Sequence, residues 1–246
     1  MQTNHSAESE TLATRRLAGF GGIAFVLALL IQNVIHAAAP RAGASVADVA
    51  SYYSDHRTLI ILTSALLPVG ALSLFAYASA LINASQQGGP WARFCGTLGT
   101  IGVTLIGALF LVTNVFEIGL AVHASDLASQ PTVTSALFDV RNAAFGLNLA
   151  AIGIALWGLG LGARRVSLSP RWTTWLIVPG GALLLIGSGL ATSIADGSPV
   201  IALPLIGFLC WCAWVLATGI ALLTSAPAEE RSAVSRPEQA PSPTLS

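Results

Sequence analysis

The sequence has little charge and no lysine. Its 246 residues include 11 basic side chains, all of them arginine, and 11 acidic ones, so the formal net charge is zero and only 9% of residues are charged. An average soluble domain carries about 25% charged residues, and this chain has too few to cover a water-facing surface. Because no basic field exists to attract phosphates, we expect no nucleic-acid partner.

Cysteines and catalytic motifs are also scarce. The three cysteines are Cys95, Cys210 and Cys212, and the last two stand two residues apart, which places them on different sides of a helix. This spacing fits neither a disulfide framework nor a zinc ribbon. The sequence contains no P-loop, no dinucleotide-binding glycine pattern and no Gly-x-Ser-x-Gly elbow. We therefore expect no cofactor and no resident metal.

Hydrophobic residues make up 54% of the chain and form six stretches long enough to cross a bilayer core of about 30 Å. The predicted spans cover residues 17–39, 58–82, 96–122, about 135–163, 173–195 and 200–224. The sequence thus predicts an all-α membrane protein with a six-helix bundle over residues 15–225. Residues 1–14 form a polar tail, and residues 226–246, rich in proline, serine and glutamate, are expected to be a disordered tail.

The placement of arginine predicts the orientation of the bundle. With the N-terminus inside, eight of the 11 arginines fall on the cytoplasmic side, and only Arg41, Arg57 and Arg141 fall on the other. Cytoplasmic loops carry the excess of basic residues in membrane proteins. We therefore expect both tails in the cytoplasm, a location in the plasma membrane and the lipid bilayer as the main partner.

The first outer loop contains a short amphipathic pattern. Within residues 45–56, Val46, Val49 and Tyr53 fall on one face of a helix. A helix of this kind either rests on the outer leaflet or covers the end of the bundle. The sequence leaves both alternatives open.

Small residues indicate where helices pack closely. Gly158 and Gly162 form a Gly-x-x-x-Gly pair in the fourth span, the spacing that lets two helix backbones approach in a membrane. We interpret the pair first as a packing device and second as the contact of a possible homodimer.

Polar side chains of the spans gather near their outer ends, and no carboxylate lies near the predicted midplane. That placement disfavours a proton-coupled carrier, which usually needs such a carboxylate. Glu117 and Arg141 lie at similar depth on adjacent helices, so we expect an ion pair. Asp139 and Asn142 would extend it, and His36 lies at the same level. The candidate site is this outer-rim cluster of His36, Glu117, Asp139, Arg141 and Asn142.

Three functions fit these patterns. The favoured one is a non-enzymatic scaffold or sensor of the envelope, in which the outer-rim cluster is structural. The second is a small-molecule exporter or carrier, which requires a cavity near Pro68 and Pro179. The third is a membrane-embedded enzyme with an outward metal site, because His36, His56 and His123 map to the same side as Glu117 and Asp139.

Four short motifs add a family resemblance. They are Ala-Ser-Tyr-Tyr-Ser-Asp-His-Arg at 50–57, Ala-Leu-Phe-Asp at 136–139, Ser-Pro-Arg-Trp-Thr-Thr-Trp at 169–175 and Trp-Cys-Ala-Trp-Val-Leu-Ala at 211–217. The chain resembles a group of six-helix integral membrane proteins of unknown function that is common in high-GC bacteria. The resemblance implies the six-helix architecture and supplies no activity. It also implies that Tyr53, His56, Asp139 and Trp172 occupy recurring positions.

Overall fold

The computed structural model describes residues 2–41, 43–190 and 202–224, and all regular elements in these ranges are helices. Six helical segments are long and apolar enough to cross a membrane. The prediction of an all-helical chain with six candidate spans is thus confirmed. The predicted tail at 226–246, and the predicted span residues 191–195 and 200–201, lie outside the described residues.

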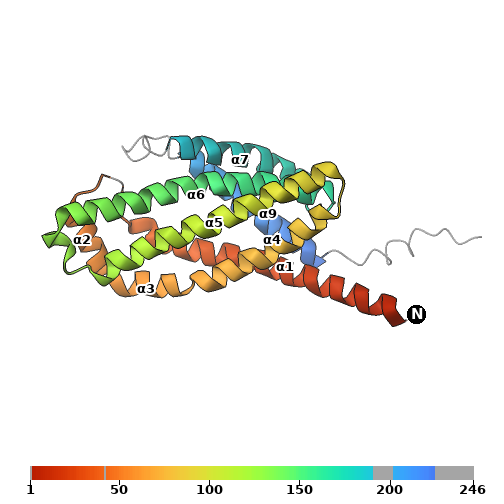
Figure 1. The fold of residues 1–246 in the computed structure, drawn as a ribbon, viewed down its shortest axis with the longest axis horizontal. Coiled ribbons are helices and arrows are strands. Elements are labelled where there is room, and N and C mark those ends of the chain that lie inside the picture. The colour runs from red at the N-terminus through yellow and green to blue at the C-terminus, as the bar shows by residue number, and fades with distance from the viewer. Residues whose placement is uncertain (1, 42, 191–201, 225–246) are drawn as a thin grey trace, which may run out of the picture.

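The candidate spans alternate in direction along the bundle (Figure 1). They are formed by α1 (Gln2–Ile35), α3 (Arg57–Ala65) with α4 (Leu67–Gln86), α5 (Pro90–Val122), α6 (Pro131–Arg165), α7 (Thr174–Gly189) and α9 (Ala202–Thr224). The connections contain the shorter helices η1 (His36–Ala38), α2 (Val46–Asp55), η2 (Leu127–Ser129) and η3 (Arg171–Thr173).

The spans form a closed ring in which each packs on the next along the chain and α9 returns to α1. The fourth span, α6, also contacts α4 and α9, and it is the most buried of the six. We call the end of the bundle that carries α2 the α2 end; the N-terminus and the end of α9 lie at the opposite end (Figure 1).

Several helices begin earlier than hydrophobicity predicts. Two of them, α5 and α6, start at Pro90 and Pro131, where proline suits the first turn because it needs no hydrogen-bond partner for its nitrogen. The first helix, α1, begins at Gln2, so residues 2–14 continue the first span as helix. A hydrophobic run therefore predicts the apolar part of each helix, and it does not predict the polar turns that extend the helix beyond that part.

The second predicted span is one candidate membrane span, Arg57–Gln86, and it consists of two consecutive helices. The division falls at Leu66, between α3 and α4. Pro68 lies two residues further on; it lacks an N–H and cannot complete the hydrogen bond to the carbonyl four residues earlier. The break therefore has a local cause in the sequence.

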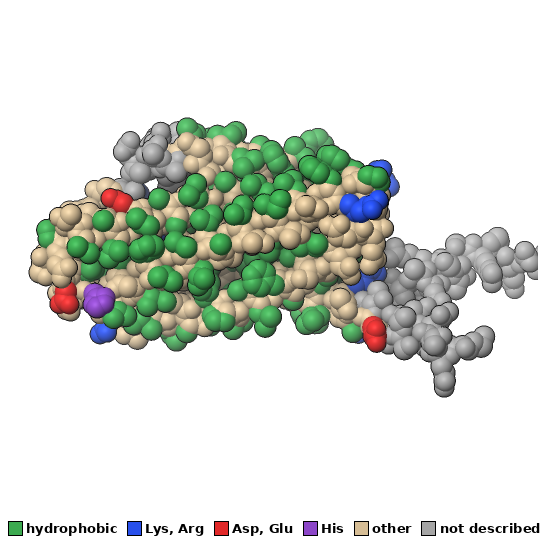
Figure 2. Space-filling model, viewed as in Figure 1, with side chains coloured by type: hydrophobic (Ala, Val, Ile, Leu, Met, Phe, Trp, Pro, Cys, Tyr) green, Lys and Arg blue, Asp and Glu red, His purple; other side chains and the backbone are tan. Residues whose placement is uncertain are grey.

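Apolar side chains cover the long sides of the bundle, and charges lie at its two ends (Figure 2). Leu72 is 71% exposed and Trp175 is 82% exposed, which is unusual for large hydrophobic residues in water. Six of the described arginines lie at the end opposite α2, whereas Arg41, Arg57 and Arg141 lie at the α2 end.

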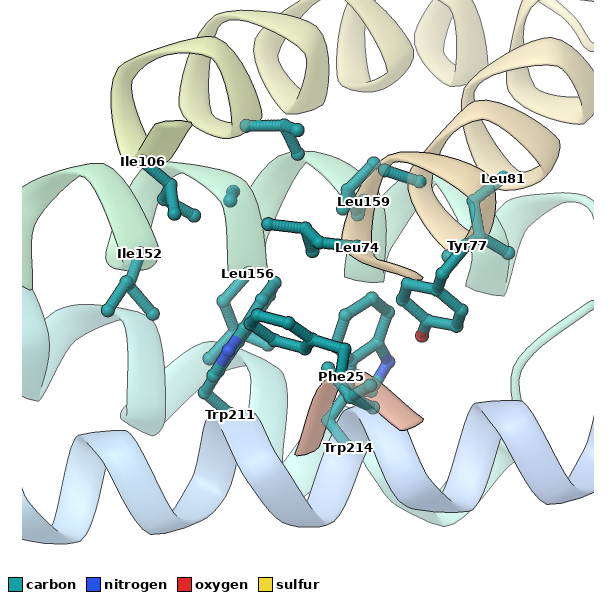
Figure 3. Close-up of a cluster of buried hydrophobic side chains, with 14 of the residues drawn as sticks. Phe25, Leu74, Tyr77, Leu81, Ile106, Ile152, Leu156, Leu159, Trp211 and Trp214 are labelled. Atoms are coloured by element: carbon teal, nitrogen blue, oxygen red, sulfur yellow. The ribbon is translucent and has the colours of Figure 1, made fainter. Parts of the chain in front are cut away.

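An aromatic cluster fills the middle of the bundle (Figure 3). Trp211 and Trp214 of α9 are fully buried, with ring centroids 5.4 Å apart. The ring of Phe25 from α1 meets Trp211 edge-on at 6.4 Å, and Tyr77 from α4 meets Trp214 at 5.8 Å. Three spans distant in sequence are thus held together by aromatic contacts.

Glycines bring α5 and α6 into close contact. Gly158 of α6 lies directly on the backbone of Gly99 in α5. Gly162 of α6 lies against α4, where a Cβ added at Gly162 would be 2.6 Å from the hydroxyl oxygen of Ser85. Both residues of the Gly-x-x-x-Gly pair are buried by neighbours within the chain. A homodimer would therefore have to use another surface, and dimerisation itself stays a prediction.

We predict that Gly158→Ala lowers the free energy of unfolding by about 1–3 kcal/mol, the usual cost of overpacking. Its new methyl group would press on the backbone of α5, which has no side chain to move aside. Gly119→Ala in α5 is the matched control, because a Cβ there meets nothing within 4 Å. Thermal unfolding of the purified protein should show the loss for Gly158→Ala alone; equal melting temperatures for both variants would contradict the packing argument.

Candidate functional site

Three helices bring three charged side chains together at the α2 end. Glu117 lies near the end of α5, Arg141 lies in the third turn of α6, and His36 follows the last residue of α1. The helices α5 and α6 are antiparallel neighbours, so the last turns of one face the first turns of the other. The polar cluster predicted from helix depth is therefore assembled by the α5–α6 hairpin and closed by α1.

The centre of the cluster is the Glu117 carboxylate, which is 3% exposed. Its Oε1 accepts hydrogen bonds from Arg141 through Nε, at 2.9 Å, and through Nη2. The same guanidinium donates through Nη1 to Oδ1 of Asn142 at 2.9 Å and stacks over the ring of Phe145 at 5.7 Å. The structure thus contains the predicted ion pair, with three nitrogens of the arginine engaged.

His36 is held between two acceptors. Its Nε2 lies 3.1 Å from Oε2 of Glu117, and its Nδ1 lies 2.8 Å from the carbonyl oxygen of Gln32. Neither oxygen has a proton to give when the carboxylate is ionised, so both contacts are hydrogen bonds only when the imidazole carries both protons and is charged. Burial alone would lower the pKa of His36, but the hydrogen bond and the negative charge of Glu117 outweigh it and raise the pKa above its usual range.

The helix α2 covers this cluster. Val49 and Tyr53 are 2% exposed and pack into a second hydrophobic core with Leu120 and Phe138 of the α5–α6 hairpin. The amphipathic pattern of residues 45–56 therefore forms a helix that closes the end of the bundle. Burial raises the pKa of the Tyr53 hydroxyl, which also feels the charges of Arg141 and Glu117.

Asp139 does not belong to the cluster, although the sequence analysis included it. It stands two residues before Arg141, about 200° around the helix, and therefore faces away from Glu117. Its side chain is exposed and lines a shallow depression beside Val49 and Phe138. Asn142 does belong, through its bond to Arg141.

The histidines disperse. His56 donates through Nδ1 to the carbonyl oxygen of Tyr52 at 3.0 Å, and its ring stacks on the Tyr52 ring with centroids 4.7 Å apart. His123 is exposed at the end of α5. Among the described residues, no three His, Cys, Asp or Glu side chains come close enough to hold a metal ion. The outward metal site considered for an enzyme has no assembled ligand set in this part of the chain.

A cavity of about 390 Å³ lies between the aromatic cluster and the charged cluster. Its walls come from α1, α3, α4, α5, α6 and α9, and Pro68 at the break of the second span is part of its lining. Gln32 lines it one turn before His36. The cavity near Pro68 that a carrier would require is therefore present, and Pro179 is not part of its lining.

A buried hydroxyl cluster at the opposite end was missed in the sequence. The hydroxyl of Ser169 lies 2.9 Å from those of Thr173 and Thr218 and accepts a hydrogen bond from Nε1 of Trp214 at 3.2 Å. Arg164 donates to the carbonyl oxygen of Ser169 at 3.0 Å. The cluster joins two of the resemblance motifs, 169–175 and 211–217, so those motifs could have signalled it.

No family model, no curated protein and no solved structure matches this chain. The resemblance to six-helix proteins of high-GC bacteria therefore stays a prediction.

We predict that Glu117→Gln and Arg141→Gln each lower the free energy of unfolding by about 3–5 kcal/mol, because each leaves a buried charge without its partner. The double variant should cost less than the sum of the two single variants, and a double-mutant cycle measures the difference. Asp139→Asn is the control and should change the free energy by less than about 0.5 kcal/mol. Additive losses would remove the ion pair from the account of this site.

Proposed function

We propose that the chain is a multi-pass protein of the plasma membrane with both termini in the cytoplasm, and that it is a non-enzymatic sensor of pH on the outer side. The exposed apolar belt supports insertion in a bilayer, and the six described arginines at the end opposite α2 support the orientation. The α2 end then faces outward, and the charged cluster lies at the outer rim.

The cluster is better suited to holding helices than to catalysis. Both carboxylate oxygens of Glu117 are engaged, by Arg141 and His36, and α2 lies over them. A general base or nucleophile needs a free position from which to reach a substrate, and this carboxylate offers none. The group of the cluster that can gain or lose a proton near neutral pH is the His36 imidazole.

The observation that carries the proposal is that both ring nitrogens of His36 face acceptors. Neutral imidazole has one N–H, so loss of the proton leaves either Glu117 or the carbonyl oxygen of Gln32 without a donor. The charged groups around His36 are Glu117 from α5 and Arg141 from α6, and Tyr52 of α2 feels both. His36 begins η1, and the chain continues from η1 into α2. If His36 loses its bond to Glu117, the segment that connects α1 to α2 loses its anchor, and α2 can move away from the cluster.

We predict the orientation from labelling with a membrane-impermeant maleimide. In a background with Cys95, Cys210 and Cys212 replaced by alanine, single cysteines at the exposed positions Asp139 and Arg165 mark the two ends. In right-side-out vesicles Asp139→Cys should react, and Arg165→Cys should react only after permeabilisation. The reverse pattern would place the α2 end in the cytoplasm and end the proposal of an outward sensor.

We predict that stability falls as the pH rises. Because the folded-state pKa of His36 is raised, its contribution to the free energy of unfolding is fully present below the unfolded-state value of about 6.5 and is lost as the pH rises through the higher folded-state pKa. Melting temperatures of the wild type should decline across that window, and those of His36→Gln should not. His56→Gln, which leaves Glu117 untouched, should keep the decline.

A second readout separates sensing from stability alone. Spin labels at the exposed residues Ala47 of α2 and Leu147 of α6 report the distance between the cover and the bundle. The wild type should give one narrow distance distribution in acid and a broader one above the folded-state pKa of His36, whereas His36→Gln should give the same distribution at both. An unchanged wild-type distribution would mean that the proton stabilises the protein without moving α2.

A further inference from the structure

Two described residues of the cavity lining each carry a buried polar atom without a hydrogen-bond partner. The two atoms are Oδ1 of Asn148 in α6, an acceptor, and Nε1 of Trp211 in α9, a donor. Asn148 is 5% exposed and Trp211 is fully buried. An unpaired buried polar group costs about 1–3 kcal/mol. An occupant of the cavity that both donates and accepts would remove that cost.

The rest of the lining is almost entirely hydrocarbon. Figure 3 shows Trp211 among four apolar residues of the cavity wall, which are Phe25, Leu74, Ile106 and Ile152. None of the described residues that line the cavity has a charged side chain. A carboxylate would place its oxygens against the oxygen of Asn148, and an amine would bring a charge with no partner. A hydroxyl group fits both unpaired atoms, because it donates one hydrogen bond and accepts others.

The cavity reaches the apolar surface of the bundle. Phe75 of α4 and Leu111 of α5 line it and are 43% and 56% exposed, so its mouth lies between these two helices, on the side that lipid would cover. Gly107 gives the ring of Phe75 its place at this mouth, since a Cβ there would lie 3.3 Å from Cζ of that ring. A molecule dissolved in the bilayer can enter here without crossing water.

We infer that this cavity binds an amphipathic alcohol from the bilayer, with its hydroxyl donating to Asn148 and accepting from Trp211 and its hydrocarbon body against α1, α4 and α5. The size of the ligand follows from the volume. A dry cavity of about 150 Å³ holds benzene, so 390 Å³ has room for about fifteen carbon atoms. An isoprenoid or fatty alcohol of that length is the ligand class. The inference does not depend on pH sensing by His36.

The test uses the full chain in lipid nanodiscs and a diazirine-bearing analogue of farnesol, an isoprenoid alcohol with fifteen carbons. Irradiation should label peptides of α4, α5 and α6 that line the cavity. Unlabelled farnesol should compete about tenfold better than farnesene, the matching hydrocarbon, because one to two net hydrogen bonds separate them. Equal competition by the two compounds would overturn the role of the hydroxyl.

Two kinds of variant locate the ligand. Ala71→Phe puts a ring into the cavity and should abolish the labelling, whereas Leu72→Phe, on the exposed side of the same helix, should not. Trp211→Phe and Asn148→Leu should bring the advantage of farnesol over farnesene down to threefold or less. The competition between farnesol and farnesene is measured on the wild type, so it tests the role of the hydroxyl even if one of the variants fails to fold.

Labelling spread over lipid-facing residues such as Leu72, and unchanged by Ala71→Phe, would overturn the site itself. Loss of the pH response in His36→Gln with unchanged labelling would leave this inference standing. Labelling that fails while the pH response of the wild type persists would remove the ligand and keep the sensor, so the two proposals fail separately.

Discussion

The arrangement of the α2 end depends on one buried carboxylate. Glu117 holds Arg141 from the next helix and His36 from the first, so a single anion fixes the positions of three spans. Two cations and one anion in a site of this burial are costly to desolvate, and the cost is offset only because nearly every donor meets an acceptor. The surrounding apolar core under α2 is built around that requirement.

The opposite half of the bundle is held by different means. Glycines let α5 and α6 touch along their backbones, and aromatic rings from α1, α4 and α9 fill the space that the helices leave between them. Lipid gives no hydrophobic drive between helices, so close packing has to provide the cohesion. The cavity lies where the two arrangements meet, at the level where Pro68 divides the second span and the close packing stops.

The charged cluster and the cavity suit two different roles, the proposed pH sensing and the inferred ligand binding. In the charged cluster both carboxylate oxygens of Glu117 already have partners, which suits the proposed sensor. The cavity is apolar, includes exposed residues of the apolar surface in its lining, and has two lining residues with an unsatisfied polar atom, which suits the inferred ligand. Gln32 connects the charged cluster and the cavity: its carbonyl oxygen accepts a hydrogen bond from His36, and the same residue lines the cavity. A signal between the two sites would pass through this last turn of α1.

The sequence by itself determined the helical class, the number of candidate spans and the matching level of Glu117 and Arg141 on two neighbouring helices, because hydrophobic runs and helix length are local properties. It also placed a helix over residues 45–56. The tertiary structure alone decided that Gly158 meets Gly99, that α2 packs on the α5–α6 hairpin, and that Asn148 and Trp211 line the same cavity. These depend on which faces of distant helices meet, and hydrophobic periodicity does not specify a face when lipid and core are both apolar.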